Sequence, residues 1–529
     1  MVVPELRPWR SARPRLTRVA EAVRPRLARA VAATGPRVAR LARAASPQVT
    51  RITRVKTWQY TAGAATAGLA LAAGVVTAAG PWDSTGQRTA ERDRAVAAGQ
   101  PGGASHGGAA GRAGANGTGP RPAPSAASVL TGLGGATNAG LPDGEALADV
   151  LDPLLHDAAL GGRRSAAVVD IATGKRLYGT GTDEALTPAS TTKIATAVAA
   201  LSALGADHRL ATRAVFEPDT RELILVGGGD PTLTAGRDAG GGASLRTLAA
   251  RTAAALEKQD VRAVTLSYDT TLYAGSDLHP IGVNDNLARV TALMADEART
   301  DGSTSGPAPR HTDPAAEATR AFGDLLAAEG IETTPPGPSK ATGRADTLAT
   351  VSSPPLSALV ERMLTHSDND IAEALARHTA LATGERADFA GAGRAIEKQL
   401  KKLGVPTRGA VIKDGSGLNR DGRLTAALLT ALLTKAADPG HPDLRPTLTG
   451  LPVAGFTGTL TGRYGDGAAG LVRAKTGTLT GVNTLAGTVV DASGRVLAFA
   501  FLGSDTTDAV TAQSALDRAA TALAACGCG

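Results

Sequence analysis

Two pairs of strand-like runs stand at opposite ends of a long stretch of this chain, and they constrain its fold more than any other feature. The first is "AAVVDIATGKRLYG" (166–179), and the second is "TLAGTVVDASGRVLAFAFLG" (484–503), which turns at Asp491–Gly494. Each predicts an antiparallel hairpin, because two apolar runs flank a short turn that contains glycine. Apolar residues at helical spacing precede the first hairpin from Leu141 and follow the second over Thr507–Ala525. We therefore expect both ends to join one antiparallel sheet with helices on its faces, an α+β fold.

The middle of the chain has strands and a helix of its own. Strand-like runs occur in "RAVFEPDTRELILVGGG" and "AVTLSYDTTLY", and "LRTLAARTAAALEKQ" has helical spacing. These elements predict an inserted domain at 211–315, which divides the α+β body into 139–210 and 316–525.

The start of the chain is basic and is followed by an uncharged segment. Residues 1–56 contain 14 lysines and arginines against two glutamates, and residues 61–80 contain no charge. As a helix, residues 61–80 would be about 30 Å long, enough to cross the hydrocarbon core. Arginines before the segment and none just after it favour a cytoplasmic N-terminus. We predict a basic, disordered cytoplasmic segment at 1–56 and one membrane-spanning helix at 57–81.

The alternative for this segment is a long signal peptide that is cleaved after Ala79 and releases the chain. Both interpretations place the folded body outside the cytoplasm, so a membrane explains the basic residues better than a nucleic acid does. Residues 82–138 are rich in Gly, Ala, Pro and Ser without an apolar period, which predicts a flexible linker. The two cysteines, Cys526 and Cys528, are too close in sequence to bridge well, and we expect an unbridged tail.

One serine and one lysine lie three residues apart in "TPASTTKIATAVAALSALG" (187–205). Thr187 is a suitable N-cap and Pro188 is favoured at the first helical position, which would put Ser190 in the first turn. The Ser190 N–H would then lack an intrahelical acceptor, and the helix dipole would favour negative charge on the serine oxygen. Lys193 would project from the same helix face. The pair could form an activated nucleophile, although S-x-x-K alone is equally a helix start with a solvated lysine.

Two further short motifs favour the catalytic interpretation. The chain has one S-x-N, at Ser367–Asn369, and one K-T-G, at Lys475–Gly477, and Ser190–Lys193 is its one S-x-x-K. The three motifs, in this order, resemble those of the serine penicillin-binding proteins and β-lactamases. A closer resemblance is to the D-alanyl-D-alanine carboxypeptidase/endopeptidase branch, the low-molecular-mass class C penicillin-binding proteins. Residues about 140–525 share this resemblance, which is carried by "GGGDPTL" (227–233), "TALMADEAR" (291–299), "DGSGLNR" (414–420), "LPVAGFTGTL" (451–460) and "AKTGTL" (474–479).

The resemblance implies a penicillin-binding transpeptidase/β-lactamase-like domain and a role for each motif in acyl transfer. Ser190 would be the acylated nucleophile and Lys193 its base. Ser367 would relay a proton to the leaving amine, because a hydroxyl both accepts and donates. No cofactor is implied, and no pair of histidines has H-E-x-x-H spacing, so we expect no metal.

The resemblance also implies a substrate-binding set. Asn369 would bind the amide of the substrate, and Lys475 and Thr476 would hold its terminal carboxylate. Gly477 would let the peptide lie against the strand. The Thr478 N–H would be the second oxyanion donor, opposite that of Ser190.

One stretch departs from the family pattern. In "DGSGLNR", Asn419 stands where the family usually has serine, and we expect Asp414–Gly417 to be a structural turn.

The spacing of the motifs helps to choose among activities. The 177 positions from Ser190 to Ser367 exceed what a compact β-lactamase needs, and no E-x-x-L-N follows Ser367. We therefore predict a serine-type D-alanyl-D-alanine carboxypeptidase/endopeptidase that acts on peptidoglycan peptides and is acylated by β-lactams. The alternatives are a β-lactamase-like hydrolase and a poorly active, penicillin-binding wall sensor.

Overall fold

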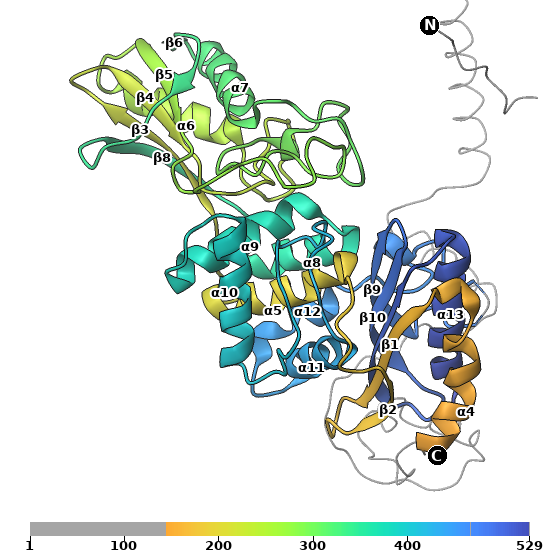
Figure 1. The fold of residues 1–529 in the computed structure, drawn as a ribbon. Helices are drawn as coiled ribbons and strands as arrows, with labels where there is room; N and C mark the ends of the chain where they lie inside the picture. Colours follow the sequence, from red (N-terminus) through yellow and green to blue (C-terminus); the bar gives the residue numbers. More distant parts are fainter. Residues whose placement is uncertain (1–143, 466, 528–529) are drawn as a thin grey trace, which may run out of the picture. The chain divides into compact units, whose positions relative to one another are not determined.

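The computed structural model describes residues 144–465 and 467–527 (Figure 1). The predicted basic segment 1–56, membrane helix 57–81 and linker 82–138 lie outside these residues. Within the described part of the chain, none of the helices is both long enough and apolar enough to cross a bilayer.

The two predicted hairpins join in one antiparallel sheet, in the order β2-β1-β11-β10-β9. Its strands are β1 Arg163–Asp170, β2 Arg176–Thr180, β9 Val472–Leu479, β10 Val482–Val490 and β11 Val496–Ser504. β1 and β11, which come from opposite ends of the body, pair with Ala167 opposite Ala500. The predicted α+β fold is therefore confirmed for the body of the chain.

Helices cover both faces of this sheet, as Figure 1 shows for β1 and β10 between α13 and the α5–α11 group. On β1, Val168 belongs to the apolar cluster formed with α4 and α13, whereas Ala167 belongs to the cluster formed with α5 and α11. Successive strand residues point to opposite faces, so an unbroken apolar run is expected where both faces are covered. The helices of the body are α4 Gly144–Leu155, α5 Thr192–Leu204, α8 Leu356–His366, α9 Asn369–Thr383, α10 Phe389–Lys402, α11 Ala426–Ala437, α12 Pro446–Thr449 and α13 Ala509–Ala525.

Helix α5 lies at the centre of the helical layer. All ten residues from Thr192 to Leu201 are buried. A helix that is apolar on every side is stable only when it is surrounded, and its many alanines let neighbouring helices pack closely. Helices α5 and α9 share one apolar cluster with α8, α10 and α11. This burial fixes the position of the residues at the start of α5.

The inserted domain has a second sheet, in the order β6-β5-β4-β3-β8, with β7 also paired to β5. β3 is antiparallel to both β4 and β8, whereas β5 is parallel to β4, β6 and β7. α6 and α7 complete its apolar core. The elements are β3 Ala211–Glu217, β4 Glu222–Val226, α6 Leu245–Glu257, β5 Ala263–Asp269, α7 Pro314–Ala328, β6 Glu332–Thr333, β7 Gly337–Pro338 and β8 Asp346–Ser352.

The inserted domain extends further along the chain than the predicted boundary at residue 315. β8 returns to pair with β3, so the second sheet uses residues up to Ser352. α7 also packs on this sheet, through the buried residues Ala318, Phe322 and Leu326. In β8, Ala349 and Val351 are the two buried residues, and the residues around them are exposed or half-buried. So short an alternation is a weak strand signal in the sequence.

The closing helix is present as predicted. α13 buries Ala512, Leu516, Ala519 and Leu523 at helical spacing. Cys526 follows it and is disulfide-bonded, so the expectation of an unbridged tail was wrong. Short 3-10 helices occur at η2 Ala158–Leu160, η3 Ala189–Thr191, η4 Asp296–Ala298, η5 Pro442–Leu444 and η6 Gly458–Leu460.

Candidate active site

The start of the serine helix differs from the expected one. Ser190 lies in η3, and α5 begins two residues later at Thr192. Thr187 was expected to cap the helix, but its hydroxyl instead donates to the carbonyl of Arg420 (3.2 Å) and accepts from Arg423 (3.1 Å). Ala189 adopts a positive φ of 47°, a backbone conformation that alanine rarely accepts and that the surrounding contacts must hold. Ser190 still lies at the N-terminal end of the helical segment.

Lys193 lies beneath Ser190 and is fully buried. Its Nζ donates to the Ser190 Oγ at 3.0 Å, to the Asn369 Oδ1 at 2.7 Å and to the carbonyl of Ser416 at 2.9 Å. Three acceptors match the three hydrogens of an ammonium group. The first two motifs therefore meet at one amine, although 176 positions separate Lys193 from Asn369 in sequence.

The buried amine has an altered proton affinity. Burial lowers the pKa of Lys193 to about 8, against the opposing charges of Asp414, Glu373, Asp368 and Asp370. Desolvation disfavours the charged form of a lysine, and the nearby carboxylates offset part of that effect. A fraction of the Lys193 amines is therefore neutral near pH 7 and can accept a proton.

The second motif occupies the junction of two helices. Ser367 ends α8 in a left-handed conformation (φ 58°, ψ 38°), and Asp368 caps α9 by accepting from the Ile371 N–H at 3.0 Å. Asn369, the first residue of α9, accepts from Lys193 and donates through Nδ2 to the carbonyl of Asn286 at 2.8 Å. An amide oxygen has two lone pairs and its nitrogen two hydrogens, so Asn369 keeps one of each for a ligand.

The third motif lies on β9, next to the serine turn. Lys475 is fully buried and donates to the carbonyl of Thr476 at 2.9 Å. Burial, followed by the charges of Lys193 and Arg463, holds the pKa of Lys475 well below its usual range. Thr476 and Thr478 line the cleft, and the side chain of Lys475, the residue before Thr476 in β9, is buried.

Gly477 is needed where β9 approaches the serine turn. A Cβ at this position would lie 2.1 Å from the Thr484 Oγ1, 2.8 Å from the carbonyl of Pro188 and 3.1 Å from the Ala189 Cβ. Thr484 itself donates to the Pro188 carbonyl at 2.9 Å. The missing side chain thus lets the strand pack against η3, in addition to the expected room for a peptide.

Gly477→Ala is expected to displace the serine turn from β9. Overpacking at such a contact costs about 1–3 kcal/mol of stability, and the displaced Ser190 should react slowly. The melting temperature and the rate of labelling by a fluorescent penicillin measure the two effects. Gly462→Ala is the matched control, because no atom lies within 4 Å of a Cβ built there, and it should change neither quantity. A Gly477→Ala variant that labels at the wild-type rate would contradict this account.

The three motifs line one cleft with a volume of about 480 Å³. Ser190, Ser367, Asn369, Thr476 and Thr478 all face it. The structure therefore brings five of the eight predicted site residues to the surface of one cleft. Lys193 contacts two of them, Ser190 and Asn369, and Lys475 and Gly477 flank Thr476 in β9. Other described residues of the lining come from the inserted domain and from helices, a strand and loops of the body: Asn286, Arg299, Ser305, Gly306, Pro307, Arg310, His366, Asp368, Asp370, Leu418, Thr459, Leu479 and Thr480.

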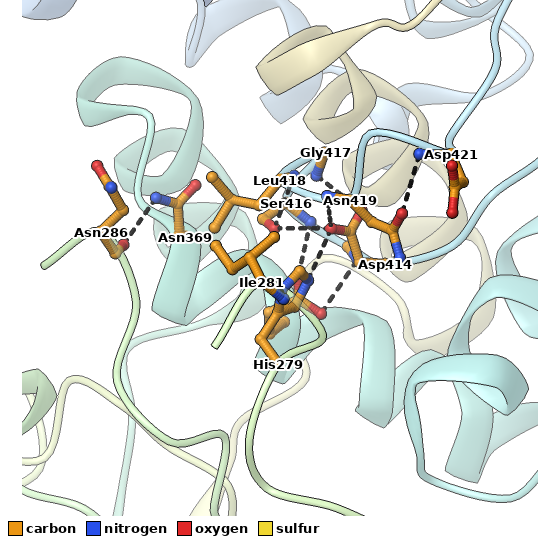
Figure 2. A network of polar contacts seen from close by, with 12 residues as sticks. His279, Ile281, Asn286, Asn369, Asp414, Ser416, Gly417, Leu418, Asn419 and Asp421 are labelled. Atoms are coloured by element: carbon orange, nitrogen blue, oxygen red, sulfur yellow. Dashed lines mark hydrogen bonds and ion pairs between the residues drawn. The ribbon is translucent and has the colours of Figure 1, made fainter. Parts of the chain in front are cut away.

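The turn Asp414–Gly417 has a larger role than the sequence suggested. The carbonyl of Ser416, in this turn, accepts a hydrogen bond from Lys193. Figure 2 shows the Asp414 carboxylate at the centre of the turn's hydrogen bonds. Asp414 accepts from the Gly417 N–H at 2.9 Å and from the Asn419 N–H at 2.7 Å. The side chain of Asn419 accepts from the Asp421 N–H at 3.0 Å, so it stabilises the turn.

Glu373 supports the same turn from α9. Its carboxylate accepts from the backbone N–H groups of Gly415 at 3.1 Å and Ser416 at 2.9 Å. Sequence reasoning missed this residue. One signal could have found it, since Glu373 follows Asn369 by four residues and so lies on the same helix face.

Two buried groups contain three potential metal-ligating side chains each. They are His279, Glu373 and Asp414, and Glu297, Asp368 and Asp370, with ligand atoms within 4.8 Å of one another. The carboxylates of the first group accept from the backbone of the 414–419 turn. In the second group, Glu297 pairs with Arg299 and Arg362, and Asp370 with Arg310. Backbone N–H groups and arginines thus already contact these carboxylates, and we assign no metal to either group.

Comparisons with known proteins identify the family of the chain. The model of the D-Ala-D-Ala carboxypeptidase 3 (S13) family matches residues 147–304 and 286–523. Carboxypeptidase DacB of Mycolicibacterium smegmatis is 38% identical over 381 residues, which cover 68% of this chain and 80% of that protein. The D-alanyl-D-alanine carboxypeptidase of Actinomadura sp. (strain R39) is 32% identical, over 68% of this chain and 81% of that protein.

Two crystal structures of penicillin-binding protein 4 from Haemophilus influenzae, one complexed with a β-lactam, share the fold. Their TM-scores are 0.57 and 0.54, at 22% and 24% identity, and they cover 72% and 71% of this chain and 98% and 97% of their own. The predicted resemblance is therefore confirmed. The chain belongs to the D-Ala-D-Ala carboxypeptidase 3 (S13) family and is a serine carboxypeptidase of that family.

Proposed function

We propose that Ser190 hydrolyses the terminal D-Ala-D-Ala bond of peptidoglycan peptides through an acyl-enzyme, and that it also cleaves peptide cross-links. One observation carries the proposal: the Lys193 Nζ lies 3.0 Å from the Ser190 Oγ in a fully buried position at the base of the cleft. A desolvated amine beside a hydroxyl is a base beside a nucleophile.

The proposed reaction has two steps. Neutral Lys193 takes the proton of Ser190 as the Oγ bonds to the carbonyl carbon of the penultimate D-Ala. The scissile C–N bond then breaks, and the leaving amine receives a proton from Lys193 through the Ser367 hydroxyl. Water then attacks the ester, a proton returns to the Ser190 Oγ, and the shortened peptide leaves.

The remaining cleft residues would bind the substrate. Asn369 would pair with a peptide amide through its remaining donor and acceptor. The Thr476 hydroxyl, 3.1 Å from that of Thr459, faces the cleft and would donate to the terminal carboxylate. Lys475, the neighbour of Thr476 in β9, would attract that anion in its protonated form. The backbone N–H groups of Ser190 and Thr478 would stabilise the oxyanion.

We further propose that the protein is held in the cell membrane by residues 57–81, with the catalytic body outside the cytoplasm. The support is the basic 1–56 segment followed by twenty uncharged residues. The full chain should then stay with the membrane fraction after a salt wash, and cleavage after Ala79 would instead release it.

Product analysis with the full chain tests the catalytic proposal. A model peptide that ends in D-Ala-D-Ala should lose one D-Ala, and fluorescent penicillin should label the protein and leave slowly. Rapid turnover of penicillin would identify a β-lactamase-like hydrolase. Stable labelling without release of D-Ala would identify a wall sensor. Either outcome would replace the proposal.

The rate of acylation is expected to depend on pH through Lys193. The neutral amine is the reactive form and its pKa is about 8, so kcat/KM should rise as the pH increases from 6 and level off above about 8. A pH profile of D-Ala release measures this rise, which is the acidic limb of the profile. A rate that is constant from pH 6 to pH 9 would contradict Lys193 as the base.

A further inference from the structure

The inserted domain reaches the buried lysine through one short stretch, residues 279–286, which we call the bridging segment. The segment follows β5 and precedes η4, so it belongs to the inserted domain by sequence. Its two ends contact the body at two different places, as Figure 2 shows for His279 and Asn286. His279 contacts Asp414, two residues before Ser416, whose carbonyl accepts from Lys193. Asn286 contacts Asn369, which itself accepts from Lys193.

The first contact is a hydrogen bond between His279 and the 414–419 turn. The His279 Nε2 lies 2.9 Å from the Asp414 Oδ2, and the side chains of both residues are almost completely buried. The His279 Nδ1 accepts from the Ile281 N–H at 3.2 Å. Since Nδ1 is an acceptor, the Nε2 carries the proton that is donated to Asp414. The ring also packs edge-on against Phe389, at 5.1 Å between centroids.

Asp414 passes this constraint to the lysine. Its carboxylate accepts from the Ser416 hydroxyl at 3.3 Å and from the Gly417 N–H at 2.9 Å. These bonds set the orientation of the Ser416 carbonyl, which accepts from Lys193.

The second contact acts on the other acceptor of the lysine. The carbonyl of Asn286 accepts from the Asn369 Nδ2, and this fixes the amide so that its oxygen faces Lys193. Two residues further along, the Ala288 N–H donates to the Asp370 Oδ1 at 2.9 Å. The bridging segment and its continuation therefore stabilise two of the three acceptors of the Lys193 amine, the Ser416 carbonyl through Asp414 and the Asn369 amide directly.

We propose that His279 is a positioning residue for the reaction: the inserted domain uses it, through Asp414 and the Ser416 carbonyl, to hold Lys193 against Ser190. This inference rests on the proposed roles of Ser190 and Lys193. It gives the inserted domain a part in catalysis, because the base is correctly placed only while the bridging segment is docked on the body.

The charges around the pair determine how the loss of His279 would act. Among the groups that act on Lys193, Asp414 raises its pKa the most, ahead of Glu373, Asp368 and Asp370. Burial lowers the pKa of Lys475 and the charge of Lys193 lowers it further, whereas burial and then the charge of Asp414 raise the pKa of Glu373. Without the His279 donor, the Asp414 charge is less compensated. Lys193 should then keep its proton up to a higher pH.

Three variants of the full chain test the inference. His279→Leu removes the donor, and His279→Gln keeps an N–H at a similar distance from the backbone. Phe389→Leu removes the packing partner of the ring but leaves the His279–Asp414 bond. For each variant, the pH profile of kcat/KM for D-Ala release, the rate of acylation by fluorescent penicillin and the melting temperature are measured.

We expect His279→Leu to lower both rates by about 10- to 100-fold, the effect of losing a hydrogen bond to a charged group. Its acidic limb should move to higher pH by about half a unit to one unit. His279→Gln should keep the wild-type limb and lose at most about threefold in rate. Phe389→Leu should lower the melting temperature without moving the limb. If His279→Leu does not fold, His279→Asn takes its place, because its shorter amide does not reach Asp414.

Two results would overturn the inference. One is a His279→Leu or His279→Asn limb that coincides with that of the wild type. The other is a limb that moves equally in Phe389→Leu, which would reduce His279 to a packing residue. Failure of the proposed function is distinct, since then Ser190→Ala and Lys193→Met would keep their activity in the same assay.

Discussion

Ser190→Ala is expected to abolish both release of D-Ala and labelling by fluorescent penicillin. The hydroxyl oxygen that would form the acyl bond is gone, and loss of a nucleophile that acts with its base typically lowers kcat by about 10⁵- to 10⁶-fold. The fold should survive, because the Ser190 Oγ forms its hydrogen bond with Lys193 at 3.0 Å and lies at the cleft surface. The melting temperature should therefore stay near that of the wild type.

Ser202→Ala is the matched control for this change. Ser202 lies on the same helix, α5, and its hydroxyl approaches only the Gln399 side chain, at 3.5 Å. It should release D-Ala and bind penicillin at wild-type rates. Residual labelling of Ser190→Ala above the rate of a heat-denatured sample would show that another side chain is acylated, and the assignment of Ser190 would then be wrong.

The sheet of the body could be predicted because its strands carry local signals. β1 and β10 are apolar on both faces and are followed by turns with glycine, so the hairpins are visible in the sequence alone. β8 was not predicted as part of the inserted sheet. Its partner, β3, precedes it by more than a hundred residues, and only Ala349 and Val351 in it are buried. Pairing at such a distance depends on tertiary packing rather than on a local pattern.

In the candidate site, too, local motifs could be predicted from the sequence and long-range contacts could not. The first two motifs identified Ser190, Lys193 and Asn369, and the structure brings Ser190 and Asn369 within hydrogen-bonding distance of Lys193. The groups that hold Lys193 in place were not predicted. Ser416 acts through its carbonyl, which every residue has, and His279 acts through Asp414, 135 positions away. Backbone acceptors and contacts of this range leave no mark on residue type or spacing.

The N-cap at Thr187 failed for a related reason. Thr-Pro before an apolar helix is a good start signal, and the local preference is real. In the folded chain, Arg423 and the Arg420 carbonyl take the Thr187 hydroxyl, and η3 is pressed against β9 and the 414–419 turn. Long-range contacts thus replace the local cap at Thr187, three residues before the serine.

Lys193→Met is expected to remove most of the activity while keeping the fold. Methionine has a similar length and no amine, so Ser190 loses its base, and we expect kcat/KM for D-Ala release and the penicillin acylation rate to fall by about 10³- to 10⁴-fold. Two acceptors, the Asn369 Oδ1 and the Ser416 carbonyl, lose a donor, which destabilises the protein. The desolvation of a buried lysine is relieved at the same time, and this offsets part of the loss.

The double variant Ser190→Ala/Lys193→Met separates a base from a merely structural lysine. If the two residues act as one unit, the double variant should be no slower than Ser190→Ala alone, because removing either one already removes the activated nucleophile. If the rate losses of the two single variants multiply in the double variant, the two residues do not act as one unit. Lys340→Met, an exposed lysine of the inserted domain, is the control for the substitution itself and should leave both rates unchanged. Lys193→Met should also lose the limb near pH 8, since the group that titrates there in the wild type is absent.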